Sequence, residues 1–563
     1  MAGFFKELKA LFANKFTAIY LVLALPILFL FGHDVISRRG DLACLVALRL
    51  TCVQLINSEQ IPYIDFFDWS QPVVYELFQL PFALQSLLAK LNLGTRLEDV
   101  TEAILLLLTA LSSLVTFTIF MYGRKRLQKA GLQETDSKDL LAQVEQAALP
   151  FALTPLLLSY FARFQFGESQ YLMVLALVPW IAMRWLAYQS ISLPTVWALI
   201  TGAICGLTLS LEVPYAITLV AIEVLLVSVF RRLKAVFSYE CLGALLATLV
   251  IWMRINQSPD AMQSAYWHWI LPLRWLQFQD LDEMIQGPGA APELAYIFYL
   301  FVLAVFVSVV LGQKFKTVTL SSGLAIIGMG FFLLEKQGYT RDIIIAAAGI
   351  LLTLSLAIAA CGQAASRFFD GKVSALILGQ CLLAISATVF CGYYLRQIEL
   401  DYAEGINPHP RQVPLGTTDI NLFVQENSKW GEPVSIICDY PDPAYPLLFN
   451  LERTPGSYLL FARPLRLLMR LQDRGLNTGH WKEFDEHIVN TLKAEFTSGR
   501  SDLVLLHGAY VKDYMHSRGL DKDLAERYTE GGAATFLSDN RQPREFLGYY
   551  FSFAAWHKSQ KGK

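Results

Sequence analysis

The sequence predicts a polytopic α-helical membrane protein of about eleven transmembrane helices, followed by a C-terminal extracytoplasmic α/β domain. Hydrophobic residues make up 54% of the 563 residues and charged residues only 17%, whereas a soluble protein carries about 25% charged residues. The hydrophobic residues come in blocks of about 17–20, which is the length that crosses a bilayer core. After residue 396 the composition becomes that of a soluble protein.

Eleven blocks have the length of a transmembrane helix. They cover roughly residues 16–32, 103–122, 147–164, 170–187, 194–211, 214–230, 236–253, 294–312, 317–334, 342–360 and 373–393. Lysines precede the first block, and basic clusters follow four of the even-numbered ones, at 124–126, 231–234, 314–316 and 367–372. Because positive residues concentrate in cytoplasmic loops, we expect a cytoplasmic N-terminus and, after an odd number of crossings, an outer C-terminus. The expected location is the plasma membrane, which is the inner membrane in bacteria.

This topology divides the chain into a transmembrane domain, 1–396, and a soluble outer domain, 397–563. The first outer loop, 33–102, contains helical periodicity over 41–56 and 73–91, which predicts two helices lying along the membrane surface. A second outer loop covers 254–293 and is rich in tryptophan. In the outer domain we expect strands at 434–438, 503–506 and 546–554, and an amphipathic helix at 481–495.

The first outer loop holds the most distinctive stretch of the chain, IPYIDFFDWSQPVVYE at 61–76. It places Asp65 and Asp68 among aromatic residues and two prolines. One interpretation is a functional segment that positions a substrate. Another is an amphipathic segment whose rings anchor it at the depth of the lipid headgroups, with Asp68 capping the helix that follows.

The order of features in this part of the chain resembles the GT-C superfamily. One hydrophobic segment is followed by a long outer loop with an early aspartate and then by a segment similar to PYxDFFDWxxPxxYxL. The members of that superfamily are integral membrane glycosyltransferases, including the protein O-mannosyltransferase and aminoarabinose-transferase types. The resemblance covers the chain loosely from end to end and is specific only in the first loop. It implies a GT-C-like fold and an enzyme, a hexosyl- or pentosyltransferase, that takes its sugar from a polyprenyl phosphate.

The resemblance also implies an aspartate soon after the first transmembrane segment that acts as the base in an inverting transfer. Asp34 and Asp41 both fit that position, and Asp41 is preferred because it begins the helix leading to the aromatic stretch. A second acid is expected on the next outer loop, where Glu168 lies in a short turn near Arg163. Alternatively, Asp41 is a helix N-terminal residue and Glu168 is solvated or paired with Arg163.

The leaving group in such a transfer is already a phosphate, so it needs cationic stabilisation more than a proton donor. Candidate phosphate-binding residues in the second outer loop are Arg254, His268 and Arg274. Candidate substrate-binding residues are Tyr63, Asp65, Asp68 and Glu212. The alternative for the cations is an interfacial belt of Trp and Arg, and for Glu212 a solvated loop position.

The expected partners are a polyprenyl-phosphate-linked sugar, a lipid, glycan or protein acceptor, and membrane lipids. The net charge of −2 and the lack of a strongly basic segment argue against nucleic acid. No cofactor or metal-ligating cluster is predicted, and the participation of a divalent metal stays open. Two further hypotheses are a transporter or flippase of a lipid-linked glycan, which requires charges in the middle of several helices, and a non-catalytic scaffold.

Overall fold

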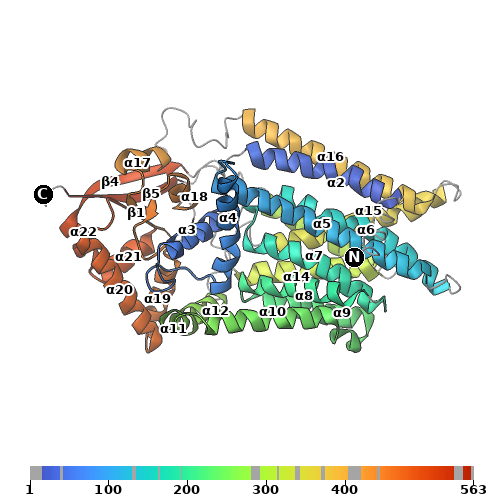
Figure 1. Ribbon diagram of the computed structural model, residues 1–563, viewed down its shortest axis with the longest axis horizontal. Coiled ribbons are helices and arrows are strands. Elements are labelled where there is room, and N and C mark those ends of the chain that lie inside the picture. Colours follow the sequence, from blue (N-terminus) through green and yellow to red (C-terminus); the bar gives the residue numbers. More distant parts are fainter. Residues whose placement is uncertain are drawn as a thin grey trace. The chain divides into compact units, whose positions relative to one another are not determined.

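The computed structural model describes residues 15–37, 42–129, 135–162, 165–191, 193–279, 292–312, 316–335, 343–368, 374–403, 420–438, 441, 444–537 and 550–559. The chain forms two compact units, each built from three separate segments. Unit 1 comprises Met1–Arg38, Thr101–Ile251 and Ile285–Gly405, and unit 2 comprises Arg39–Val100, Trp252–Met284 and Ile406–Lys563. Figure 1 shows the helices and strands of the two units.

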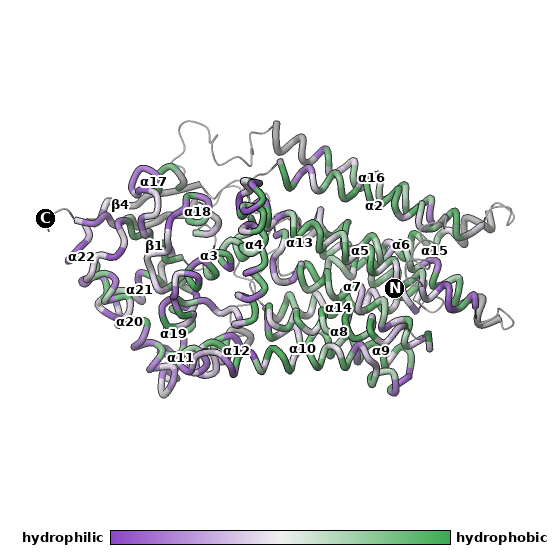
Figure 2. The backbone as a smooth tube through the Cα atoms, in the orientation of Figure 1, coloured by the Kyte–Doolittle hydropathy of each residue, from purple (hydrophilic) through white to green (hydrophobic). Residues whose placement is uncertain are grey.

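Unit 1 is built from helices. They are α2 (Lys15–Ser37), α5 (Leu97–Lys129), α6 (Thr135–Phe161), α7 (Ser169–Tyr188), α8 (Thr195–Leu207), η2 (Thr208–Ser210), α9 (Tyr215–Phe230), η3 (Leu233–Val236), α10 (Tyr239–Asn256), α13 (Pro292–Leu311), α14 (Lys316–Glu335), α15 (Ile344–Phe368) and α16 (Ala375–Ala403). Figure 2 shows that hydrophobic residues dominate most of these helices.

Eight helices in the described part of the chain are long and apolar enough to cross a membrane. They lie at Phe16–Ile36, Leu97–Lys129, Asp139–Phe161, Ser169–Tyr188, Tyr239–Asn256, Lys316–Leu333, Ile344–Gly362 and Leu376–Arg396. The other three predicted segments, 194–211, 214–230 and 294–312, coincide with shorter apolar helices at Thr195–Ser210, Tyr215–Phe230 and Ile297–Leu311. The predicted helices are therefore present, and the eight longer ones support a multi-pass membrane protein.

Helix α15 is the packing centre of unit 1, since it contacts α6, α7, α13, α14 and α16. Small residues allow the close approach: a Cβ on Gly349 of α15 would overlap the backbone of Ala325 in α14, and one on Gly328 would overlap the backbone of Ala346. The hydrophobic effect does not drive helices together in a bilayer, because the lipid tails are as apolar as the helix surfaces. Close van der Waals contacts of this kind provide the attraction instead. Helix α16 also packs along α2 (Figure 1).

Hydroxyl side chains join neighbouring helices of unit 1. Thr109 of α5 lies 2.7 Å from the Tyr171 hydroxyl of α7, and Thr353 of α15 donates to Ser321 of α14 at 2.9 Å. Buried hydroxyl groups need partners in an apolar surrounding, so these pairs fix the rotation of the helices about their axes.

Unit 2 contains one five-stranded sheet and several helices. The strands are β1 (Pro433–Ile437), β2 (Thr454–Pro455), β3 (Leu503–His507), β4 (Tyr528–Leu537) and β5 (Tyr550–Lys558), in the order β2-β1-β3-β5-β4. The helices are α3 (Cys44–Asn57), α4 (Pro72–Lys90), α11 (Asp260–Ala265), η4 (Tyr266–Ile270, one π-helical turn), α12 (Leu271–Gln279), α17 (Ile420–Asn427), α18 (Ala444–Asn450), α19 (Arg463–Asp473), α20 (His480–Ser498), α21 (Ala509–Ser517) and α22 (Leu520–Arg527). The sheet is parallel from β2 to β3 and antiparallel from β3 to β4.

The structure confirms the helices α3, α4 and α20 and the strands β1 and β3 that the sequence predicts. The third predicted strand, 546–554, is β5 from residue 550 onward, and its first four residues lie outside the described part. The predicted second loop is helical over much of its described length, because α10 reaches Asn256 and α11, η4 and α12 follow. The predicted course of α3 and α4 along a membrane surface stays a prediction.

Candidate functional site

Asp34 is a buried carboxylate in the last turn of α2, with 1% of its surface exposed. The hydroxyl of Tyr394 in α16 donates a hydrogen bond to Asp34 Oδ2 at 2.7 Å. The ring of Tyr394 packs edge-on against Tyr160 of α6 at 4.2 Å between centroids, and the Tyr160 hydroxyl donates to the Ile27 carbonyl of α2 at 2.6 Å. Three helices therefore hold this carboxylate in one position.

Glu168 is a second buried acid of unit 1, 3% exposed, at the N-cap of α7. Its carbonyl accepts the first hydrogen bond of that helix from the Leu172 N–H at 2.9 Å. Phe166, two residues earlier, packs edge-on against Phe31, one turn before Asp34, with 5.0 Å between ring centroids. The segments that carry Asp34 and Glu168 are thus packed together within unit 1.

Three further residues of the predicted site remain: Asp41, Arg163 and Glu212. Asp41, the preferred base, and Arg163, the alternative partner of Glu168, lie outside the described residues. Glu212 is half-buried in the short connection between η2 and α9 of unit 1.

The aromatic stretch at 61–76 belongs to unit 2, where it binds a segment nearly 400 residues away. The Tyr458 hydroxyl donates to the Tyr63 carbonyl at 2.9 Å, and the Phe67 N–H donates to the Tyr458 carbonyl at 2.6 Å. Tyr63 is fully buried at φ 68°, which a bulky residue adopts only when its surroundings hold it there. The Tyr63 hydroxyl donates to the Ser70 carbonyl and the Tyr63 N–H to the Phe66 carbonyl at 2.8 Å.

The two carboxylates of this stretch have different environments. Asp68 is buried and accepts a hydrogen bond from the Tyr75 hydroxyl at 3.1 Å, whereas Asp65 is exposed and accepts one from the Ile61 N–H at 2.7 Å. The alternative role of Asp68 as a helix cap is wrong, because α4 begins at Pro72 with Gln71 as its N-cap. Burial, together with the nearby Asp68 carboxylate, raises the pKa of Tyr75, so its hydroxyl stays protonated and can donate.

The three predicted phosphate-binding cations also lie in unit 2. Arg254, in the last turn of α10, donates to Glu76 at 3.0 Å, and both side chains are half-exposed. His268 is exposed on η4, with its Nδ1 3.0 Å from the Ser264 carbonyl. The Arg274 guanidinium of α12 lies 5.0 Å from the centre of the Trp69 ring, which is the geometry of a cation–π contact.

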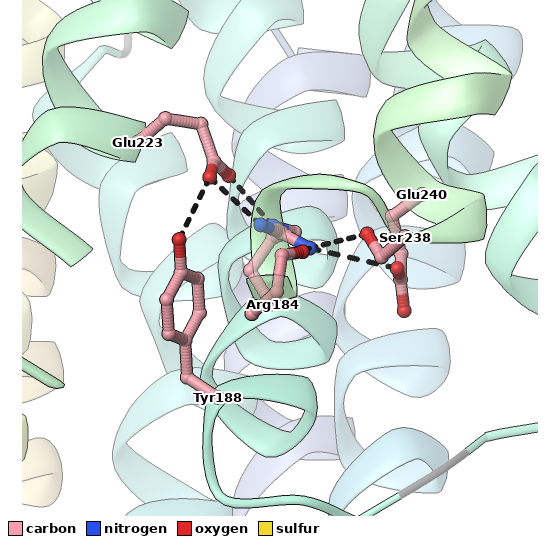
Figure 3. Close-up of polar contacts among 6 residues, drawn as sticks. Arg184, Tyr188, Glu223, Ser238 and Glu240 are labelled. Carbon is pink, nitrogen blue, oxygen red and sulfur yellow. Dashed lines mark hydrogen bonds and ion pairs between the residues drawn. The ribbon is translucent and has the colours of Figure 1, made fainter. Parts of the chain in front are cut away.

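A buried charge network in unit 1 is not among the sequence predictions (Figure 3). Arg184 of α7 is fully buried, and its Nε and Nη2 donate to the two carboxylate oxygens of Glu223 in α9 at 2.6 and 2.7 Å. On the other side its Nη1 donates to the Ala235 carbonyl at 3.0 Å and to the Ser238 hydroxyl, and lies 3.6 Å from Glu240.

The sequence signal for this network is three isolated charges inside three predicted apolar segments, 170–187, 214–230 and 236–253. Each of the three guanidinium nitrogens of Arg184 donates to the protein, and four of its five N–H groups have a hydrogen-bond partner. Such extensive pairing is typical of a clamp that ties α7, α9 and the start of α10 together. A buried arginine with so many donors engaged has little capacity left for a ligand.

Within the described residues, no group of three or more His, Cys, Asp or Glu side chains has the arrangement of a metal site. Participation of a divalent metal stays the open prediction that the sequence makes. No protein-family model matches the chain, and a search of curated proteins finds no match for it.

Proposed function

We propose that this protein is a membrane glycosyltransferase. It would move a sugar from a polyprenyl-phosphate donor to a hydroxyl of a lipid, glycan or protein acceptor on the outer face of the membrane. The proposal combines the eight candidate membrane helices, the similarity of the first loop to the GT-C superfamily, and the buried acids of unit 1.

The reaction needs one base and no protonating acid. The acceptor oxygen attacks the anomeric carbon as the bond from that carbon to the phosphate oxygen breaks, and the phosphate leaves with the bonding electron pair. The acceptor hydroxyl proton passes to a carboxylate, and inversion follows from attack on the face opposite the leaving group. Within unit 1, Asp34 would be this base, with Glu168 as the second acid.

The observation that carries the proposal is the burial of Asp34 and Glu168 on packed segments at the ends of α2 and α7. Carboxylates are costly to bury in an apolar helical protein, and those that persist there usually serve a function. The Tyr394 hydroxyl would orient Asp34 as a hydrogen-bond donor orients a general base.

A second candidate function is transport of a lipid-linked glycan. Such a transporter requires charged residues in the middle of helices, and Glu223 of α9 has that position, although its bidentate pairing with the buried Arg184 of α7 already gives it a structural role. A transporter of this kind would move the labelled glycan across the membrane without transferring its sugar to an acceptor.

Transfer is tested with membranes that contain the protein, a radiolabelled polyprenyl-phosphate sugar, and total lipid, glycan and protein fractions as acceptors. We expect labelled product with the wild type, and strong loss in Glu168→Gln and in either Asp34→Asn or Asp41→Asn. Asp99→Asn, an exposed acid at the start of α5, is the matched control and should retain full activity. Wild-type activity in all three acid variants would remove these residue assignments.

A further inference from the structure

A cavity of about 430 Å³ with a mixed polar and apolar lining opens on unit 2, away from the aromatic stretch in sequence. Its wall comes from the loop after α19, the first half of α20 and the end of α21. The volume is in the range of small-molecule sites. None of its lining residues belongs to the transfer centre proposed above.

Asp485 organises the floor of this cavity. Its carboxylate accepts hydrogen bonds from the Tyr514 hydroxyl at 2.6 Å, from Asn477 Nδ2 at 3.0 Å and from Arg518 Nη2. The carboxylate is buried, and three donors from two segments, the loop after α19 and the C-terminal part of α21, fix it. The floor is therefore preorganised, which lowers the entropy cost of binding a ligand.

The charges of the cavity cancel. Arg518 is paired with Asp485, and Lys482 with Glu486 one turn later on α20 at 3.7 Å. A phosphate or a cation would find no excess of opposite charge here. Val489 is the one aliphatic side chain longer than a methyl group in the described wall, and the rest of its apolar surface comes from carbon atoms of polar side chains and the backbone. The wall therefore mixes hydrogen-bonding groups with small apolar areas.

The floor retains hydrogen-bonding capacity that the protein does not use. Arg518 Nε is a donor, and Asn477 Oδ1 is an acceptor. Neither atom has a hydrogen-bond partner among the described residues, and both are buried in the wall. The orientation of the Asn477 amide follows from its neighbour, since only the NH₂ group can face the Asp485 carboxylate. Both atoms are inaccessible to solvent, so the hydrogen-bonding groups that a ligand would meet directly are the exposed amides of Gln472 and Asn490 in the wall.

From these features we propose that the cavity binds a neutral saccharide. Each sugar hydroxyl donates one hydrogen bond and accepts up to two, which matches an uncharged wall of amides and internally paired charges. An extended peptide has donors and acceptors too, but its side chains need apolar pockets that one valine does not provide. The inference goes beyond the proposed transfer, because binding here requires neither the lipid donor nor the acids of unit 1.

The test is saturation-transfer NMR on the full chain in lipid nanodiscs prepared without sugar-headed detergent. Maltotriose, mannotriose and chitotriose are offered one at a time as probes, with a neutral tripeptide as comparison. We expect transfer to at least one saccharide and none to the peptide. Loss of one hydrogen-bonding group should weaken binding by about 3- to 10-fold in Asn477→Ala.

Lys482→Ala, an exposed position on the rim, should also weaken binding and carries little risk to folding. Lys493→Ala is the matched control on the same helix, since Lys493 is exposed, pairs with Asp523 and does not line the cavity. Thermal unfolding of each variant checks that it is folded. The proposal is overturned if no saccharide binds at millimolar concentration, if the peptide binds more tightly, or if folded Asn477→Ala and Lys482→Ala both bind like the wild type.

Discussion

Glu495 is the residue of unit 2 whose ionisation opposes folding most clearly. Its side chain is 8% exposed on α20, where Oε1 accepts a hydrogen bond from the Tyr458 N–H at 2.6 Å and lies 3.8 Å from Arg500. Burial raises the pKa of this carboxyl from 4.5 to about 7, although the Tyr458 N–H and Arg500 oppose the shift. Tyr458 in turn binds the aromatic stretch through Tyr63.

A raised carboxyl pKa makes the folded state less stable as pH rises. Folding stability is fully present below the unfolded pKa near 4.5 and declines until pH passes about 7. Glu495→Gln keeps an oxygen acceptor for Tyr458 and removes the charge. We therefore expect the variant to be more stable than the wild type at pH 8, by about 2–3 kcal/mol, and to show no such gain at pH 4.5.

The measurement is the unfolding midpoint of both proteins at the two pH values. The control is Glu526→Gln, which changes an exposed acid on α22. Its unfolding midpoint should differ from that of the wild type by the same amount at pH 4.5 and at pH 8. An equal effect of Glu495→Gln at pH 4.5 and pH 8 would contradict the raised pKa.

The sequence predicts some residue environments and not others. The resemblance to the GT-C superfamily singles out Asp34 and Glu168, and the aromatic stretch singles out Asp68; all three are buried. The sequence cannot assign Tyr394 to Asp34 or Tyr458 to Tyr63, since those partners are 360 and 395 residues apart and no local pattern encodes the pairing.

At the scale of elements, the Arg184 network is a buried polar tie between helices of unit 1. Glu223→Ala would leave the fully buried guanidinium without its bidentate partner. Removing one member of a buried ion pair typically costs about 3–5 kcal/mol. We expect a large drop in the unfolding midpoint of the purified protein, and a smaller one for the charge-free pair Arg184→Met with Glu223→Leu.

The exposed pair Arg254–Glu76 provides the comparison. Both of its side chains are about half-exposed, so Glu76→Ala should cost at most about 1 kcal/mol. Similar losses for Glu223→Ala and Glu76→Ala would show that burial does not decide the contribution of these pairs.

The apolar helices are predictable because lipid requires a long, continuous hydrophobic run. Elements whose stability comes from their neighbours are harder to predict. Strand β2 has only two residues, Thr454 and Pro455, and β4 contains the sequence EGGAAT, which has little strand propensity and is held by pairing with β5. Each of the three charges of the Arg184 network interrupts a different apolar helix. The sequence does not show that they meet, because their meeting depends on how α7, α9 and α10 pack.

At the scale of the whole molecule, the number of crossings decides where the C-terminal region lies. Eight crossings would place both termini on the same side, whereas crossing by the three shorter helices as well gives eleven and places them on opposite sides. The basic clusters favour eleven, because the positive-inside rule then holds at all of them.

We therefore expect an alkaline phosphatase fusion at the C-terminus to be active and a green fluorescent protein fusion there to be dark. Fusions truncated after residue 234, in the basic segment that follows α9, should give the opposite pattern. A fluorescent and phosphatase-inactive C-terminal fusion would mean an even number of crossings and would place unit 2 segments at 406–563 on the cytoplasmic side.

The most direct test of the proposed enzyme is the rate of sugar transfer by Asp34→Asn beside Tyr394→Phe and wild type, at equal amounts of folded protein. Asparagine keeps an oxygen that accepts from Tyr394 but cannot take a proton, so loss of the base should slow transfer by about 10²–10⁴-fold. Tyr394→Phe only loosens the carboxylate and should slow it far less. Wild-type transfer by Asp34→Asn would contradict Asp34 as the base, and absence of transfer by the wild type with every acceptor fraction would contradict the enzyme itself.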